Sequence, residues 1–251
     1  NMLAVPPHKF DIEKVNKYQF LYKRGGQVSI SNKYNLHSNY NKMNLKFPQD
    51  YNYMCETYPY PELKSLITKK FSNYHKEKGN LWLIKPKSSS EGRGIHIFDS
   101  LESEKGSFLI TKYIENPHLI NGKKYDFRIY VLITSANPLS IYIYNQGLVR
   151  IASQKYSLNM NQLNSKYIHL TNTAVNKENS DYIFNDSINS EKGNKWSLQA
   201  YRYYCKKNGI DFDSIFANIK DITIKVILSI YDNLYKGNEV KFNHKNFYHK
   251  S

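Results

Sequence analysis

The sequence predicts an α+β fold in which mostly antiparallel strands fill the middle of the chain and helices fill its end. Two observations support this prediction. Short apolar runs rich in β-branched and aromatic residues occupy residues 81–153, whereas apolar residues recur at helical spacing beyond residue 195. Strands and helices that occupy separate stretches of a chain are typical of α+β proteins. With 251 residues, the chain can bury a substantial core in one large or two modest domains.

The first half of the chain is predicted to contain one helix and four strands. Residues 1–50 are polar and rich in Asn and Lys, and their periodicity is too weak to predict an element. Residues 62–79 are expected to form a short helix, because Leu63, Leu66 and Ile67 share one face. The predicted strands, each bounded by Gly, Asn, Ser or Pro, are Leu81–Ile84, Ile95–Phe98, Ser107–Ile114 and Tyr125–Thr134.

The second half begins with a predicted hairpin and ends with two predicted helices. Residues 139–153 alternate like a hairpin that turns at residues 145–147, where Gly147 can supply a positive φ. After a loop around residues 157–195, a helix is expected over residues 195–210, with Gly209 as its C-terminal cap. A longer helix is expected over residues 213–234, with apolar residues at 3.6-residue spacing and Asp213 as its N-cap.

The chain is strongly basic, with 36 Lys and Arg against 21 Asp and Glu and a net charge of +15. Such a surplus favours an acidic partner, which could be a nucleic acid, an anionic membrane surface or an acidic protein. The abundance of Asn, Lys, Ile and Tyr is also what an AT-rich coding sequence produces, so codon bias remains an alternative source of the lysines. No recognised RNA- or DNA-binding motif accompanies the charge, and we expect no nucleic-acid partner.

Cysteine use and hydropathy indicate the compartment. The two cysteines, Cys55 and Cys205, form neither a disulfide framework nor a metal-binding spacing, which favours a reduced, intracellular environment. No apolar run approaches the roughly 18 residues of a membrane span, and the first residues lack a signal-peptide core. The chain starts at Asn1 and stops in the polar string KFNHKNFYHKS, so we expect it to be a fragment of a longer protein.

A glycine-bearing loop in residues 81–99, LWLIKPKSSSEGRGIHIFD, is a candidate phosphate site. A dinucleotide-binding or Walker loop needs a helix after the glycines, whereas Gly94 leads directly into the strand-like IHIF. What fits is a flexible loop that joins two antiparallel strands and folds over phosphates. Its serines offer hydroxyls, Gly92 and Gly94 permit close approach, and Lys85 and Arg93 bring positive charge. An ordinary hairpin turn is the alternative.

Three further segments carry charged or polar candidates. In KKYDFRIY, Lys124, Asp126 and Arg128 share one face of a strand, either as a solvated edge or as the wall of a polar cleft. Arg150 ends another strand and could be a simple surface arginine. The segment YIHLTNTAVNK is dense in hydroxyls and amides, which a turn or helix cap would also explain.

Taken in order, these segments resemble the tubulin tyrosine ligase-like family, and within it the polyglutamylase branch. The resemblance covers roughly residues 27–232 and is carried by residues 47–64, 81–98, 113–157, 166–177 and 194–229. It implies an ATP-grasp fold, in which mostly antiparallel sheets flank a nucleotide cleft. The implied divisions are an N-terminal remnant or linker over 1–26, a central subdomain over 27–120 and an incomplete C-terminal subdomain over 121–251.

The resemblance also implies roles for individual residues. Lys85 matches the lysine that meets the ATP phosphates, and Gly92, Arg93 and Gly94 match the loop that closes over them. Arg128 matches the arginine that faces developing charge at the reaction centre. Adenine would be held by the hinge, which is formed by Thr111, Lys112, Tyr113 and Ile114. The other nucleotide contacts would come from Lys124 and Asp126 and from Thr171 and Asn172, with His169 close behind. The carboxylates of the incoming amino acid would be gripped through Arg150, Thr173 and Lys195.

The chain departs from the family pattern at three places. The family usually has Gln at the position of Thr111. The branch commonly has Tyr-Ser at the positions of Thr173 and Ala174, so part of the amino-acid pocket differs. The residue before the glycine loop is often Arg or Gln, whereas Glu91 would disfavour an acidic acceptor unless it is turned away.

The family's acidic, magnesium-binding strands should follow the long C-terminal helix, and the sequence stops before them. No metal ligands are therefore expected within this chain, although Mg²⁺ is expected as a cofactor beside ATP. Without those carboxylates, we expect the chain as given to be inactive or nearly so.

The implied activity is an ATP-dependent ligation. An amino acid, which we expect to be glutamate, would be joined to glutamate side chains of tubulin tails through an acyl phosphate. The implied partners are tubulin or microtubules and free glutamate, and the implied location is the cytoplasm, on the cytoskeleton or in a cilium or flagellum. A catalytically inactive basic module that binds microtubules or other acidic partners is the alternative.

Overall fold

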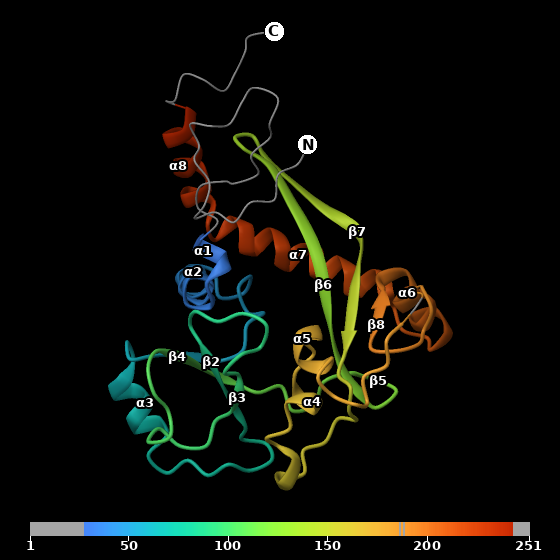
Figure 1. The fold of residues 1–251 in the computed structure, drawn as a ribbon. Helices are drawn as coiled ribbons and strands as arrows, with labels where there is room; N and C mark the ends of the chain where they lie inside the picture. Colours follow the sequence, from blue (N-terminus) through green and yellow to red (C-terminus); the bar gives the residue numbers. More distant parts are fainter. Residues whose placement is uncertain (1–27, 186, 188, 243–251) are drawn as a thin grey trace, which may run out of the picture.

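The computed structural model describes residues 28–185, 187 and 189–242. They form two four-stranded antiparallel sheets with helices around them, which confirms the predicted α+β fold (Figure 1). The first sheet has the order β1-β4-β2-β3 and the second β5-β6-β7-β8. Their strands are β1 Thr57–Tyr60, β2 Trp82–Pro86, β3 His96–Ile97, β4 Phe108–Lys112, β5 Leu119–Ile120, β6 Lys123–Ala136, β7 Leu139–Ile151 and β8 Lys195–Ser197.

The first sheet packs against α3 (Lys64–Lys70) through Ile67 and Phe71. The predicted helix over residues 62–79 is therefore too long, and Leu63 and Leu66 of its predicted apolar face are exposed. The chain leaves the helix at Phe71, whose ring packs edge-on against Trp82 and Phe98. Once that ring is buried, the polar residues that follow offer no apolar stripe to extend the helix.

β6 and β7 form one long hairpin, and the predicted turn at residues 145–147 is wrong. All of residues 139–151 belong to β7, which pairs with β6 from end to end. Between the pairs Ile129↔Gly147 and Val131↔Ile143, β7 advances four residues while β6 advances two, so this segment is a bulge. Gly147 is needed for close approach, because a Cβ there would lie 2.7 Å from the carbonyl oxygen of Arg128.

The helices α6 (Leu198–Lys207) and α7 (Phe212–Leu228) pack on the second sheet, and the β6–β7 hairpin crosses α7 (Figure 1). Gly209 has φ +66° and the Ile210 N–H bonds back to the Cys205 carbonyl at 2.9 Å, which confirms the predicted cap. The N-cap of α7 is Asp211, which accepts from the Ser214 N–H, so the prediction of Asp213 is wrong. α7 ends at Leu228, and α8 (Tyr231–Phe242) follows.

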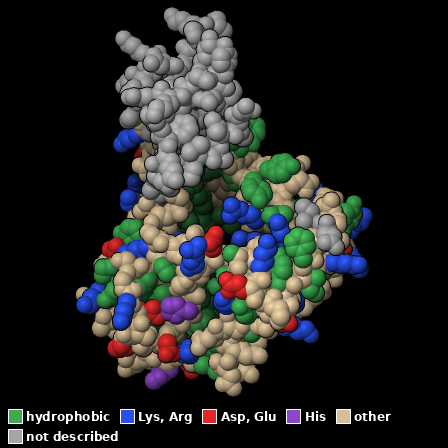
Figure 2. All heavy atoms as spheres, in the orientation of Figure 1, with side chains coloured by type: hydrophobic (Ala, Val, Ile, Leu, Met, Phe, Trp, Pro, Cys, Tyr) green, Lys and Arg blue, Asp and Glu red, His purple; other side chains and the backbone are tan. Residues whose placement is uncertain are grey.

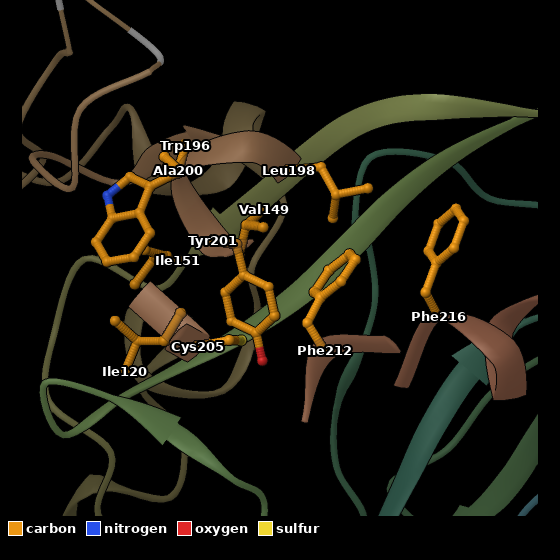
Figure 3. Close-up of a cluster of buried hydrophobic side chains, with 10 residues drawn as sticks. All are labelled: Ile120, Val149, Ile151, Trp196, Leu198, Ala200, Tyr201, Cys205, Phe212 and Phe216. Carbon is orange, nitrogen blue, oxygen red and sulfur yellow. The ribbon is translucent and has the colours of Figure 1, made fainter. Parts of the chain in front are cut away.

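The core of this half lies between the second sheet and these helices (Figure 3). It is built from the inward side chains of β5 and β7 and the apolar faces of β8, α6 and α7: Ile120, Val149, Ile151, Trp196, Leu198, Ala200, Tyr201, Cys205, Phe212 and Phe216. Tyr125, Phe127 and Ile129 of β6 pack against it. Alternate residues of β6 therefore face away from this core.

Among the described residues, four α-helices lie wholly outside the predicted set: α1 (Val28–Ser31), α2 (Lys33–Lys46), α4 (Lys166–His169) and α5 (Thr173–Asn176). Asn32 caps α2 by accepting from the Tyr34 N–H at 2.8 Å. None of the helices in the described residues is long and apolar enough to cross a bilayer. The first sheet spans residues 57–112 and the second 119–197, while the predicted division at residue 120 stays a prediction. The predicted N-terminal remnant, residues 1–26, lies outside the described residues.

Candidate functional site

The glycine loop joins β2 to β3, and these strands are antiparallel neighbours in the first sheet, as predicted. Gly92 and Gly94 have φ of +84° and +71°, a region that glycine enters without strain. Glu91 also has a positive φ, of +60°. The loop therefore has a specific conformation that other residues would resist.

Two distant segments hold this loop. A Cβ added to Gly92 would lie 2.8 Å from Asn172 Oδ1, so the loop lies directly against the start of α5. From the other side, Asn32 Nδ2 donates to Ser88 Oγ at 3.2 Å and Lys33 Nζ donates to the Ser89 carbonyl. The loop and α4–α5 enclose a cavity of about 380 Å³. The contacts of α2 could not be predicted, because the weak periodicity of residues 1–50 predicts no helix there.

Two part-buried lysines, one from each sheet, lie near one another. Burial lowers the pKa of Lys85, at the end of β2, and the nearby Lys33 lowers it further. Burial also lowers the pKa of Lys124, in β6, to about 8, and the charge of Lys85 adds to that effect. The charge of Lys85 therefore destabilises the charge of Lys124, and an anion bound near both lysines would relieve this effect.

The face of β6 that carries Lys124, Asp126 and Arg128 is turned away from the core, as their spacing predicts. Strand register sets Arg150 opposite Asp126 and Lys195 opposite Arg150. Arg150 Nε donates to Asp126 Oδ1 at 2.8 Å, and its Nη2 donates to the other oxygen, Oδ2. This hydrogen-bonded pair raises the pKa of Arg150. Arg128 lies further along β6, with its guanidinium 5.7 Å from the Tyr130 ring centre.

A second hollow of about 490 Å³ adjoins this face. It lies between the β6–β7 bulge and the junction of β8 with α6. The strand register sets Leu148, which lines the hollow, directly opposite Arg128. Its other walls include Tyr130, Tyr144 and Gln146.

The candidate hinge at the end of β4 is largely engaged within the protein. Thr57 Oγ1 and Thr111 Oγ1 form a hydrogen bond of 3.2 Å. The Lys112 N–H donates to the Glu56 carbonyl and the Tyr113 N–H to the Leu81 carbonyl, at 2.8 and 2.9 Å. Lys112 Nζ donates to the Gly79 carbonyl at 3.2 Å. Ile114 is 57 % exposed, which leaves its side chain at the surface.

The hydroxyl- and amide-rich segment, residues 167–177, connects parts of the fold by hydrogen bonds and also lies against the glycine loop. Asn176, almost fully buried, accepts from the Ser153 N–H at 2.7 Å and donates to the Leu170 carbonyl at 2.8 Å. These bonds tie the segment that carries Thr171, Asn172 and Thr173 to the end of β7. Asn172 occupies the N-cap position of α5 and Thr173 is its first residue.

Arg93 is turned towards solvent and towards Glu91. Its side chain is 76 % exposed and its guanidinium pairs with Glu91 at 2.5 Å. The same pair turns the Glu91 carboxylate towards Arg93 and partly neutralises it. Figure 2 shows Lys and Arg side chains around a hollow near the middle of the molecule.

In the part of the chain that the structure describes, no three His, Cys, Asp or Glu side chains are grouped to hold a metal ion. Asp126, the carboxylate beside Lys124, is bound by Arg150. The described residues therefore do not fit a magnesium site. Where the metal ligands lie stays a prediction.

Comparison with known proteins places these features in a family. The sequence profile described as the tubulin-tyrosine ligase family matches residues 10–249. The chain is 35 % identical over 218 residues to mouse tubulin monoglutamylase TTLL4, covering 86 % of this chain and 18 % of that protein. It is 40 % identical over 161 residues to human tubulin polyglutamylase TTLL5, covering 63 % of this chain and 12 % of that protein.

A probable β-tubulin polyglutamylase of Tetrahymena thermophila is 33 % identical over 230 residues, which cover 90 % of this chain and 19 % of that protein. The chain thus spans less than a fifth of the length of these three relatives. The match to the family profile extends over nearly the whole chain. The chain belongs to the tubulin-tyrosine ligase family, in its polyglutamylase branch.

Proposed function

We propose that this protein is an ATP-dependent ligase with an ATP-grasp fold, which joins an amino acid, glutamate in the first instance, to glutamate side chains of tubulin tails. The observation that carries the proposal is the electrostatic coupling of Lys124 to Lys85, the lysine at the end of β2 that precedes the glycine loop, next to the hydrogen-bonded Asp126–Arg150 pair. The names of the similar proteins, tubulin mono- and polyglutamylases, support the same reaction class.

ATP would lie with its phosphates against Lys85 and Lys124, under the loop of Gly92 and Gly94. Asn172 and Thr171 would flank the nucleotide from the α5 side. Adenine would lie at the hinge beside the exposed side chain of Ile114, since two hinge N–H groups are engaged in the sheet. A gripping role for Arg93 would require its side chain to leave Glu91.

The chemistry joins three negatively charged reactants in one cleft. The γ-phosphoryl group of ATP would pass to an oxygen of the acceptor carboxylate, and ADP would leave. The amine of the free glutamate would then attack the carbonyl carbon of this acyl phosphate, losing a proton as inorganic phosphate departs. Arg128 would stabilise the charge that develops at this centre, where fixed cations in a partly dehydrated site contribute most.

The incoming amino acid would bind through Arg150 and Lys195, which the strand register sets side by side, with Thr173 on the α5 side. Arg150 is pre-positioned by Asp126, so its guanidinium can meet a carboxylate without first being ordered. Mg²⁺ is proposed to be held by residues outside those described.

The basic surface would draw in acidic tubulin tails, with an on-rate that falls as salt rises. We propose a cytoplasmic location on the cytoskeleton or in a cilium or flagellum. The test is incorporation of labelled glutamate, glycine or tyrosine into microtubules by the complete protein with Mg-ATP. Incorporation of glutamate alone is the expected result. Retained, salt-sensitive microtubule binding with no incorporation of any label would overturn the ligase and favour an inactive binding module.

Arg150→Ala is expected to raise the KM for the amino acid about tenfold and the KM for ATP much less. The loss of one charge-assisted contact accounts for this magnitude. The substitution also frees the Asp126 carboxylate, which would repel an incoming carboxylate. Steady-state kinetics with each substrate varied in turn provides the measurement, and equal rises in both KM values would contradict the assigned role.

ATP affinity is expected to fall about tenfold between pH 7 and pH 9, because Lys124, with a pKa of about 8, must be protonated to bind phosphate. The free ammonium is mostly charged at pH 7 and mostly neutral at pH 9. Titration calorimetry at several pH values should also detect proton uptake on binding at pH 8–9. Lys124→Arg is the matched variant, and its affinity should be nearly constant over this range.

A further inference from the structure

Lys124 is the first member of a buried hydrogen-bonded chain that the two sheets and α4 form together. Its Nζ lies 3.2 Å from the hydroxyl oxygen of Tyr113 and 4.5 Å from the centre of that ring. The same hydroxyl lies 2.8 Å from Nδ1 of His169. Tyr113 follows β4, Lys124 is on β6 and His169 ends α4. All three side chains are partly or fully buried, so water does not compete freely for these bonds.

The direction of each bond follows from the chemistry of the groups. An ammonium can only donate, so the Tyr113 oxygen accepts from Lys124. The hydroxyl hydrogen is then left for Nδ1 of His169, which must accept it. His169 can do so because burial, with the charge of Lys124 adding to it, lowers the pKa of His169 to about 4 and keeps the ring neutral. The two bonds therefore run in one sense, from Lys124 to Tyr113 and from Tyr113 to His169.

The members of this chain are themselves held in place. The Tyr113 N–H donates to the Leu81 carbonyl, and its side chain packs in a cluster with Leu81, Ile97 and Leu163. His169 is 6 % exposed and meets the Tyr113 ring edge-on. A lysine has four rotatable side-chain bonds, and this anchoring leaves the Nζ of Lys124 with few positions to occupy.

We propose that Tyr113 and His169 are positioning residues that hold the Lys124 ammonium, through the Tyr113 hydroxyl and ring, where it receives the phosphates of the nucleotide. This inference rests on the proposed function. It assigns the hydroxyl of Tyr113 a role that is separate from any contact of its backbone with adenine. It also gives His169, which lies in the hydroxyl- and amide-rich segment, a role without direct contact to a substrate.

The experiment is a double-mutant cycle on ATP affinity, measured with ATP and the purified protein. Tyr113→Phe keeps the ring and the backbone but removes the hydroxyl, and is expected to weaken ATP binding three- to tenfold. In a Lys124→Met background, the same change is expected to have almost no further effect, because the group it positions is gone. His169→Gln is the second variant, and its effect should likewise disappear in that background.

Tyr125→Phe is the matched control. Its hydroxyl bonds to that of Tyr201 at 2.8 Å on the opposite face of β6, so its loss should leave ATP affinity unchanged. Losses of ATP affinity that add fully to that of Lys124→Met would overturn the positioning role and leave the ligase standing. No ATP binding by the unsubstituted protein would overturn the proposed function, and the inference with it. Affinity for glutamate should stay constant throughout, and a general loss in both ligands would also refute the inference.

Discussion

Lys85→Met is expected to weaken ATP binding by about a hundredfold while leaving the protein at least as stable as before. A charge-assisted hydrogen bond to phosphate contributes about 1.5–3 kcal/mol, and the neighbouring Lys124 loses the anion that both lysines share. The lowered pKa of Lys85 shows that its charge is held at a cost in free energy of folding. Replacing that ammonium with an apolar side chain of similar length removes this cost.

The measurement is the dissociation constant for ATP together with the midpoint of thermal unfolding. Lys87→Met is the matched control, because Lys87 lies two residues further along the chain and is bound by Glu62 at 2.5 and 2.7 Å. That variant should keep its ATP affinity and lose a little stability. An unchanged affinity in the Lys85 variant would show that the glycine loop is not the phosphate site.

The strands and the last helices could be predicted because their signals are local. Alternation over residues 125–134 identifies a strand whatever its partner is, and the apolar spacing of α7 identifies a helix. The same alternation placed Lys124, Asp126 and Arg128 on one face, which the structure confirms. Gly209 could be assigned for a similar reason, since a helix cap needs only the residues around it.

α2 could not be predicted because it buries little of its surface and therefore carries no apolar stripe at helical spacing. Tyr40 is its one buried residue, and that residue is held by a hydrogen bond of 2.8 Å to the Tyr51 carbonyl and by ring contacts with Tyr51 and Tyr53. The turn placed at residues 145–147 failed for the opposite reason. Asn-Gln-Gly is a good local turn signal, but the pairing of β7 with all of β6 outweighs it.

The candidate site likewise has features that local sequence predicts and features that depend on tertiary contacts. The position of the glycine loop between two antiparallel strands could be predicted from its residues. Its contacts with α2 and α5 could not, because they are tertiary contacts. The Asp126–Arg150 pair depends on strand register, which a bulge of two residues sets. The bond between Tyr113 and His169 joins residues 56 positions apart. No local pattern contains that information, whereas family resemblance supplied the candidates without their geometry.

Gly92→Ala is expected to weaken ATP binding by about thirtyfold. A methyl group at residue 92 would lie 2.8 Å from Asn172 Oδ1, closer than such contacts allow, and 3.3 Å from Val175 Cγ2, which is a tight contact. The loop would have to lift away from α5, and its amides would no longer be held over the phosphates. The positive φ of +84° adds a strain of about 1–2 kcal/mol, which lowers the free energy of unfolding.

Gly79→Ala separates these two effects, because Gly79 has nearly the same φ, +89°, and nothing lies within 4 Å of an added Cβ. Both variants should lose about the same stability from backbone strain, which urea unfolding can measure. Only the Gly92 variant should lose ATP affinity, because only its methyl group meets α5. If both variants bind ATP equally well, the contact between the loop and Asn172 does not hold the loop in its binding conformation. If both lose affinity equally, backbone strain alone is responsible and the close fit against α5 is incidental.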